Sequence, residues 1–271
     1  MKSLTASIAA FAIAFAFHGR AQTPAPEQKL TAADLAAKLN PEGTAGTSYV
    51  RFRMQVQTPG GAKPTTLQLQ SEERHFSRAA DMLYQVLWPA ARKGEAVLLH
   101  RGKGGAISGT AYSPSGKLRA IDSSGMGEPL FGSDLAPADL IENFFAWKQQ
   151  VIVGTGTVGG VNCTILESKP GPDEQSTYAR VRTWVDPRRM VAMRIEKFDE
   201  AGKVIREIDT TRVTRDSGRT IPADLAIRRP GQGSSTIVDG IAIRHDVPLT
   251  DGDFTPEAMK EVKPPRGGKQ P

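Results

Sequence analysis

The chain has 271 residues, of which 39% are hydrophobic and 24% are charged. This composition is typical of a soluble globular protein and is too polar for a membrane protein with many spans. The formal net charge of +6 is spread along the chain, whereas nucleic-acid-binding proteins concentrate basic residues in one patch. A single cysteine, Cys163, excludes an intrachain disulfide and a multi-cysteine zinc or iron–sulfur site.

The first residues have the features of a secretory signal peptide. Lys2 supplies a positive start, and residues 8–17 form an uncharged apolar run that is too short to span a bilayer. Small residues at Gly19 and Ala21 predict cleavage after Ala21, which gives a signal peptide over residues 1–21 and export to the periplasm. We expect a disordered lead-in over residues 22–30, one domain over residues 31–262 and a disordered tail over residues 263–271.

Alternation of apolar and polar residues dominates the middle of the chain. It begins at residues 49–57, where Val50, Phe52, Met54 and Val56 alternate with arginine and glutamine, as in a half-buried strand. Similar runs recur at residues 65–70, 82–88, 95–100, 107–112, 149–153, 161–167, 178–185, 191–198, 204–213, 225–228 and 236–244. Turn residues such as those at 199–202 separate the runs, which predicts an antiparallel meander of about eleven strands.

Three helices are predicted. Residues 31–34 have the spacing of a capping box, and residues 255–257 place a proline at the first position of a short C-terminal helix. The third helix opens at Pro137, and its apolar residues are expected to share one broad face. They are Leu140, Ile141, Phe144, Phe145 and Trp147.

These elements predict a mainly β (α+β) fold with one open, curved antiparallel sheet. There are too few helices to cover both faces of the sheet, so we expect the aromatic helix to cover its concave face. Two arrangements remain open at this point. The helix either covers a cavity suited to a ligand with a long hydrocarbon part, or it fills the core.

Enzyme and cofactor motifs are incomplete. Residues 154–159 match Gly-x-Gly-x-x-Gly, but a strand pattern follows where a dinucleotide site requires a helix. After the expected cleavage three histidines remain, no serine lies in a nucleophile elbow, and no two histidines have metal-ligand spacing. We therefore expect no catalytic residues, no metal and no cofactor.

Cys163 and the arginines of the predicted strands are expected to be structural. Cys163 lies in an apolar run, where a buried thiol packs as a small hydrophobic residue. Strand arginines such as Arg51, Arg53, Arg180 and Arg182 are typical of the solvated face of a sheet, with contact to anionic lipid head groups as the alternative.

Several blocks resemble the exported bacterial outer-membrane lipoprotein-sorting proteins. The most specific are residues 131–147 and 163–170, and the resemblance extends over residues 83–246, including 84–89 and 194–198. It implies a fold like that of the LolA and LolB carriers, an incomplete antiparallel barrel with a helical lid over a hydrophobic cavity. The resemblance favours the lid over the filled core.

The leading hypothesis is a periplasmic carrier, not an enzyme, that shelters the acyl chains of a lipid or lipoprotein during sorting to the outer membrane. Donor and acceptor proteins in the two membranes are expected partners. The alternative is an envelope-stress sensor or interaction domain of the same fold that binds a protein partner. The candidate ligand-binding residues are Leu140, Ile141, Phe144, Phe145, Trp147, Phe131, Met54, Trp88, Trp184 and Met193.

Overall fold

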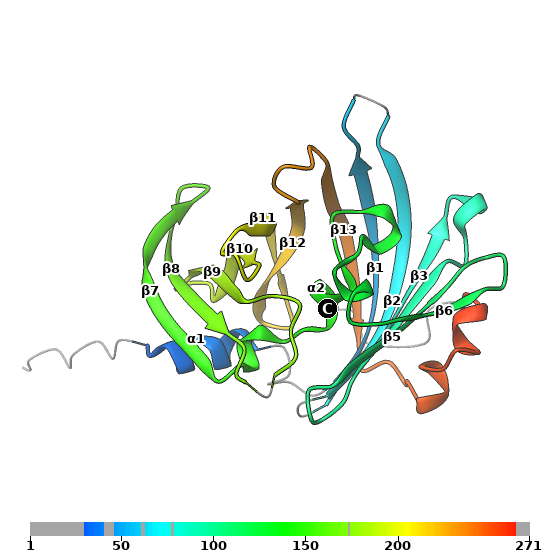
Figure 1. The fold of residues 1–271 in the computed structure, drawn as a ribbon, viewed down its shortest axis with the longest axis horizontal. Helices are drawn as coiled ribbons and strands as arrows, with labels where there is room; N and C mark the ends of the chain where they lie inside the picture. The colour runs from blue at the N-terminus through cyan, green and yellow to red at the C-terminus, as the bar shows by residue number, and fades with distance from the viewer. Residues whose placement is uncertain (1–29, 41–45, 61–62, 77–78, 173, 264–271) are drawn as a thin grey trace, which may run out of the picture. The chain divides into compact units, whose positions relative to one another are not determined.

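A single antiparallel sheet of thirteen strands is the framework of the protein in the computed structural model (Figure 1). The structure describes residues 30–40, 46–60, 63–76, 79–172 and 174–263. The strands lie in the order β6-β5-β4-β3-β2-β1-β13-β12-β11-β10-β9-β8-β7, so the joint between β1 and β13 is the one place where neighbours in the described sheet are not consecutive in the chain. The predicted open antiparallel half-barrel is confirmed. The expected signal peptide, the lead-in through Lys29 and residues 264–271 of the tail lie outside the described residues.

The sheet is built mostly from consecutive hairpins. Its strands are β1 (Gly46–Gln57), β2 (Thr65–Phe76), β3 (Ala79–Trp88), β4 (Ala96–Arg101), β5 (Ile107–Tyr112), β6 (Leu118–Ile121), β7 (Gln149–Val158), β8 (Val161–Lys169), β9 (Arg180–Asp186), β10 (Val191–Phe198), β11 (Val204–Asp216), β12 (Arg219–Arg228) and β13 (Ser235–His245). The predicted turn at residues 199–202 connects β10 to β11, and Gly202 has the positive φ that such a turn requires.

Alternation along the strands gives the sheet two different faces. Met54, Leu67, Leu69 and Val97 belong to the main buried cluster, and we call the face that carries them the inner face. The residues between them point to the opposite, outer face. Arg53, for example, pairs there with Asp239 of β13, with its Nε 2.7 Å from Oδ1.

The C-terminal segment covers the outer face of β3 and β4. Leu83 and Leu98 pack there with Phe254, Ala258 and Met259 in a second buried cluster. Gln85 donates a hydrogen bond of 3.1 Å to the carbonyl of Glu261. The segment therefore removes apolar and polar atoms of the outer face from water together.

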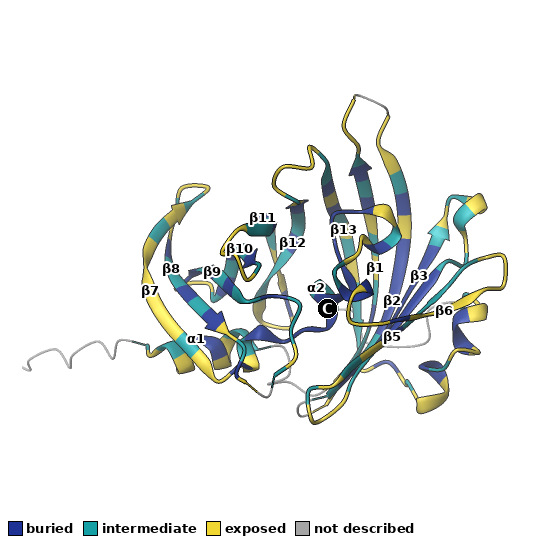
Figure 2. Cartoon of the chain, in the orientation of Figure 1, coloured by how far each residue is buried: buried dark blue, intermediate teal, exposed yellow. Residues whose placement is uncertain are grey.

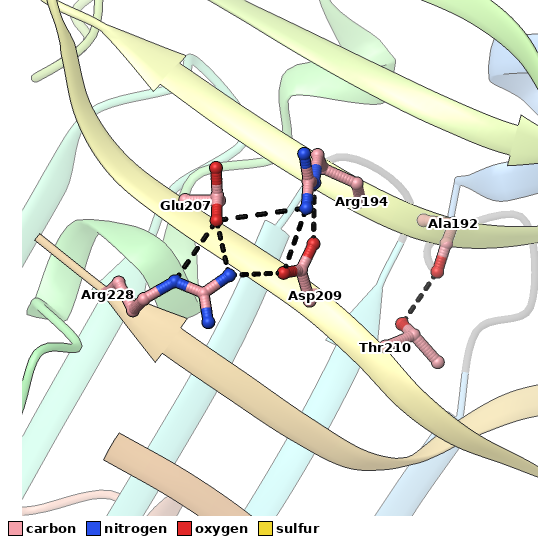
Figure 3. Close-up of polar contacts among 6 residues, drawn as sticks. All are labelled: Ala192, Arg194, Glu207, Asp209, Thr210 and Arg228. Atoms are coloured by element: carbon pink, nitrogen blue, oxygen red, sulfur yellow. Dashed lines mark hydrogen bonds and ion pairs between the residues drawn. The ribbon is translucent and has the colours of Figure 1, made fainter. Parts of the chain in front are cut away.

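Charged side chains cover the outer face of β10, β11 and β12 (Figure 3). Arg194 Nε lies 2.6 Å from Asp209 Oδ1, and Arg228 contacts both Glu207 and Asp209. These pairs join three neighbouring strands. Each is partly exposed, so its individual contribution to stability is about 0–1 kcal/mol.

The strand β7 forms one edge of the sheet and is largely exposed (Figure 2). Residues 154–158 of the glycine motif extend β7 beyond the predicted strand end at residue 153, and Gly159 lies in the turn to β8. A Cβ at Gly156 would lie 3.0 Å from the indole Nε1 of Trp184, so the indole would have to shift by a few tenths of an ångström to admit a side chain. Gly159 and Gly160 both have positive φ and form the two-residue turn to β8.

The three predicted helices have different outcomes. The helix α1 (Ala32–Leu39) is confirmed with its capping box, in which Thr31 Oγ1 accepts from the Asp34 backbone N–H. The predicted C-terminal helix is instead a pair of 3₁₀ turns, η6 (Asp251–Asp253) and η7 (Ala258–Lys260). The aromatic helix over residues 137–147 is much shorter than predicted and is described with the site below.

The C-terminal cover of the outer face can be tested by a cavity-forming substitution. Met259 is fully buried, so Met259→Ala should lower the free energy of unfolding by about 2–5 kcal/mol. Its neighbour Lys260 has a half-exposed side chain, and Lys260→Ala is the matched control, with an expected change of about 0.5 kcal/mol or less. Urea unfolding followed by tryptophan fluorescence measures both. Equal effects of the two substitutions would contradict the packing described.

Candidate functional site

Residues 125–147, which we call the cover segment, lie on the inner face of the sheet (Figure 1). The segment contains α2 (Pro137–Ile141) and three 3₁₀ turns, η3 (Gly125–Gly127), η4 (Leu130–Gly132) and η5 (Phe144–Ala146). Ile141, Phe144 and Trp147 are buried in the main cluster together with Met54 of β1. The apolar side chains of the cover segment therefore pack directly on the sheet.

The prediction of one long aromatic helix is wrong in its extent. The helix α2 ends at Ile141, because the next residue, Glu142, has an extended backbone (φ −74°, ψ 124°). The carboxylate of Glu142 accepts hydrogen bonds from Ser176 Oγ (2.6 Å) and from the backbone N–H of Thr177 (2.8 Å). Phe144 and Phe145 follow in a separate turn, η5, with their ring centroids 4.4 Å apart.

The structure brings most of the predicted site residues together. Seven of them belong to the main cluster or pack against it, and they are Met54, Phe131, Leu140, Ile141, Phe144, Phe145 and Trp147. The other three lie elsewhere. Trp88 is 51% exposed at the end of β3, and Trp184 and Met193 lie in a separate cluster around Cys163.

The positions of Trp184 and Cys163 follow from strand alternation. Val181 and Val185 of β9 belong to inner-face clusters with the cover segment and α1, so Trp184 between them points to the outer face. Cys163 is 1% exposed, as predicted for a structural thiol, and burial raises its pKa. A raised pKa disfavours the reactive thiolate.

Buried carboxylates attach the cover segment to the rest of the protein. Besides Glu142, Asp134 accepts hydrogen bonds from Ser234 Oγ (2.5 Å) and Thr236 Oγ1 (2.8 Å) and lies 3.3 Å from Arg229 Nε. These contacts hold the residues just before α2 against β13 and against the loop that precedes β13. The cover segment is therefore held by polar groups as well as by its apolar side chains.

The third carboxylate belongs to Asp139, in the first turn of α2, and its side chain is fully buried. Its Oδ1 lies 2.8 Å from Lys197 Nζ of β10, and its Oδ2 lies 3.0 Å from Arg206 Nε of β11. Tyr178 donates a hydrogen bond of 2.6 Å to Oδ1, and the backbone N–H of Ala136 donates one of 2.7 Å to Oδ2. The side chains of Asp139, Lys197 and Arg206 are 0%, 1% and 3% exposed. We call these four side chains, Asp139, Tyr178, Lys197 and Arg206, the ion cluster.

The ion cluster shifts the ionisation of its own members. Burial alone would raise the pKa of Asp139, but the charges of Lys197 and Arg206 outweigh it and hold the pKa below the ordinary value of 3.8. Burial and the neighbouring Asp139 carboxylate raise the pKa of Tyr178 well above its ordinary value. At neutral pH Asp139 is therefore a carboxylate and Tyr178 a neutral phenol.

A pocket of about 450 Å³ lies beside the cover segment. Its apolar lining includes Val97 of β4, Ala111 of β5, Ile121 of β6 and Leu130 of the cover segment. Arg119 and other charged side chains also border it. This volume lies within the usual range for small-molecule sites, about 300–1,000 Å³.

Sequence reasoning missed the ion cluster. It gave no role to Lys197, Arg206 or Tyr178. One signal was available in the sequence. Lys197 lies two residues after the apolar Ile195 in an alternating strand, so both side chains point to the inner face. A charged side chain buried there needs a partner.

Two kinds of feature are absent from the described part of the chain. It has no group of three or more His, Cys, Asp or Glu side chains placed to hold a metal ion. Among its helices, none is both long and apolar enough to cross a membrane.

Comparisons with solved structures identify the class of fold. A DUF1329 family protein from Desulfovibrio piger is 24% identical, with a TM-score of 0.76, and the match covers 84% of this chain and 97% of that one. A domain described as an outer membrane lipoprotein-sorting protein from Vibrio parahaemolyticus is 18% identical (TM-score 0.74, 85% and 97% covered). A LolA superfamily protein from Nitrosomonas europaea is 17% identical (TM-score 0.66, 85% and 100% covered). The protein is thus an open half-barrel of the LolA type, which confirms the resemblance.

Residues 79–261 match a family model described as "Uncharacterized protein", and the chain belongs to this family. No curated protein matches the chain.

The ion cluster predicts a dependence of stability on pH. A carboxylate with a lowered folded-state pKa stabilises the fold above its unfolded pKa, and this contribution is lost as the pH falls through the lower folded value. Asp139→Asn should therefore lower the free energy of unfolding at pH 7 by about 3–5 kcal/mol, because it leaves two buried cations without their carboxylate. Below pH 3.8 the difference from the unsubstituted protein should shrink.

Urea unfolding at pH 7 and at progressively lower pH measures this effect. Glu200→Gln, in the exposed turn between β10 and β11, is the control and should change stability little at either end of the range. A constant difference between Asp139→Asn and the unsubstituted protein at all pH values would contradict the prediction.

Proposed function

We propose that the protein is a binding protein of the bacterial envelope that shelters acyl chains of a lipid or lipoprotein and carries them towards the outer membrane. The fold supports this proposal, since one of the similar structures is described as a lipoprotein-sorting domain. The observation that carries it is the pocket of about 450 Å³, which combines an apolar lining with a charged border. An amphiphile has the same division between apolar chain and polar head.

The pocket and the cover segment suggest how an acyl chain gains access to the inner face. Leu130 and Phe131 line the pocket and also pack against the main cluster, so the pocket is continuous with the packing under the cover segment. In our proposal the first part of the chain occupies the pocket, and the rest displaces apolar side chains of the cover segment from the sheet. Each buried methylene contributes about 0.8 kcal/mol towards this exchange.

Filling the pocket tests its role. Ala111→Trp places an indole in the pocket and should weaken binding of a fluorescent fatty-acid probe by about tenfold or more, because the probe loses several buried methylenes. Ala120→Trp is the matched control, since Ala120 is exposed on the next strand, pairs with Thr110 and does not line the pocket. Fluorescence titration measures both variants, and thermal unfolding confirms that they are folded. Equal probe binding by both folded variants would rule out this pocket.

The proposed place of action is the periplasm, reached through a cleaved signal peptide. Its support is the short apolar run followed by Gly19 and Ala21 in the sequence. Intact-mass measurement of protein recovered from a periplasmic fraction should give a chain that begins at Gln22. Recovery of the chain with Met1 in the membrane fraction would refute the export proposal.

The interaction-domain alternative remains a hypothesis. Titration with acyl probes also addresses it, because that alternative does not require the inner face to bind lipid. A protein that binds no acyl probe under any condition would favour it over the carrier.

A further inference from the structure

The ion cluster contains more positive than negative charge. Lys197 and Arg206 both face Asp139, and within the described residues no second carboxylate lies within 4.0 Å of either cation. Together the two cations carry eight N–H donors. In the same part of the chain, Arg206 Nη1 has no hydrogen-bond partner although it is buried. Two cations therefore share one anion in the interior.

Other neighbours of the cations do not supply the missing negative charge. Lys197 Nζ lies 4.5 Å from the ring centroid of Tyr178 and 5.4 Å from that of Phe144, both cation–π contacts with neutral rings. The carboxylate of Glu142 is bound to Ser176 and Thr177 instead. Lysine and arginine are rarely this buried without full pairing, so the surplus charge needs an explanation.

The three charges are attached to different parts of the fold. Lys197 and Arg206 are on β10 and β11, which are fixed in the middle of one half of the sheet by neighbours on both sides. Asp139 is on the five-residue helix of the cover segment. A second pocket of about 160 Å³ adjoins this point and is lined by Asp139, Leu140, Phe144 and Met82, among others. The pocket thus provides space next to Asp139 in the cover segment, although neither Lys197 nor Arg206 lines it.

We propose that Lys197 and Arg206 form a binding site for the anionic group of an amphiphilic ligand, and that Asp139 occupies this site when the ligand is absent. The inference rests on the proposed function, and it specifies the class of ligand: an acyl compound with a carboxylate or a phosphate, in preference to a neutral one.

The energetics of opening favour this assignment. Moving the cover segment away without a substitute would leave two buried cations unpaired, which is strongly unfavourable. An incoming anion replaces the Asp139 carboxylate at the same donors, so one buried ion pair is exchanged for another. A neutral amphiphile makes no such exchange and must displace the cover segment by apolar contacts alone.

Dodecanoate and dodecanol are suitable probes, because they share a chain and differ in charge. Calorimetric titration should show that dodecanoate binds about 10–100 times more tightly than dodecanol, the range expected for hydrogen bonds to a charged group. Asp139→Asn should increase this ratio. On addition of dodecanoate, the melting temperature of this variant should rise more than that of the unsubstituted protein. Equal affinities of the two probes, in both the unsubstituted protein and Asp139→Asn, would overturn the inference while leaving the proposed function intact.

Lys197→Met is the complementary variant. It leaves Arg206 and Asp139 as a balanced pair, so the chain should fold, and the ratio of affinities should fall towards one. If Asp139→Asn does not fold, the ratio in Lys197→Met decides the question alone, and an unchanged ratio refutes the site. Arg194→Met is the control, because Arg194 is a partly exposed cation on the outer face of β10 and should leave the ratio unchanged.

Two further results are informative. One distinguishes the head group of an amphiphile from a free anion, and the other distinguishes failure of this inference from failure of the proposed function. Dodecyl phosphate should compete with dodecanoate, whereas inorganic phosphate at the same concentration should not. Equal competition by inorganic phosphate would mean a site for a free anion and would overturn the assignment to an amphiphile. Failure of every acyl probe to bind any variant would instead refute the proposed function.

Discussion

The contact between Asp139 and the paired cations of β10 and β11 determines how the inner face of the sheet is covered. A single sheet has two faces and no second sheet against which to bury either of them. Besides α1, which packs on Val185 of β9, the inner face is covered by a short helix and three turns, which have few hydrogen bonds of their own. Apolar packing alone would allow such a segment many arrangements, whereas the carboxylates of Asp134, Asp139 and Glu142 each require specific donors. The polar contacts therefore select one arrangement of the cover segment.

The two faces of the sheet are stabilised by different means. On the outer face, exposed pairs such as Arg194–Asp209 and the C-terminal segment with Met259 hold the strands and shield apolar side chains. None of these outer contacts depends on the position of the cover segment. In the proposed function, the inner face would exchange its cover for a ligand while the outer face keeps the strands in register. This separation suits a protein that must change its interior and keep its fold.

Much of the fold followed from the sequence because strand alternation is a local pattern. The sequence pattern located the half-barrel, the hairpin at residues 199–202 and the buried Cys163. It missed β6, whose four residues show no alternation, and the second half of β2, where the polar residues Ser71 and Glu72 are buried.

The candidate site was predictable only in part. The apolar residues of the cover segment could be recognised by type, although Glu142 ended their helix early through a contact with residues more than thirty positions away. Trp184 and Met193 were assigned to the cavity by residue type alone. Alternation along β9 instead places the Trp184 side chain on the outer face. The ion cluster joins residues from α2, β10 and β11, and such long-range pairing leaves little trace in a single sequence.

The joint between β1 and β13 has a consequence for the order of folding. Every other pair of neighbouring strands in the described sheet is consecutive in the chain, so each can form over a short connection. The cover segment connects β6 to β7, which lie at opposite edges of the sheet and do not pair. The pairing of Tyr49 with Arg244, in contrast, closes a loop that includes most of the chain. Loop closure becomes less favourable as length increases, and non-local contacts slow folding. The two meanders are therefore free to form early, and the continuous sheet is completed only once β13 is available.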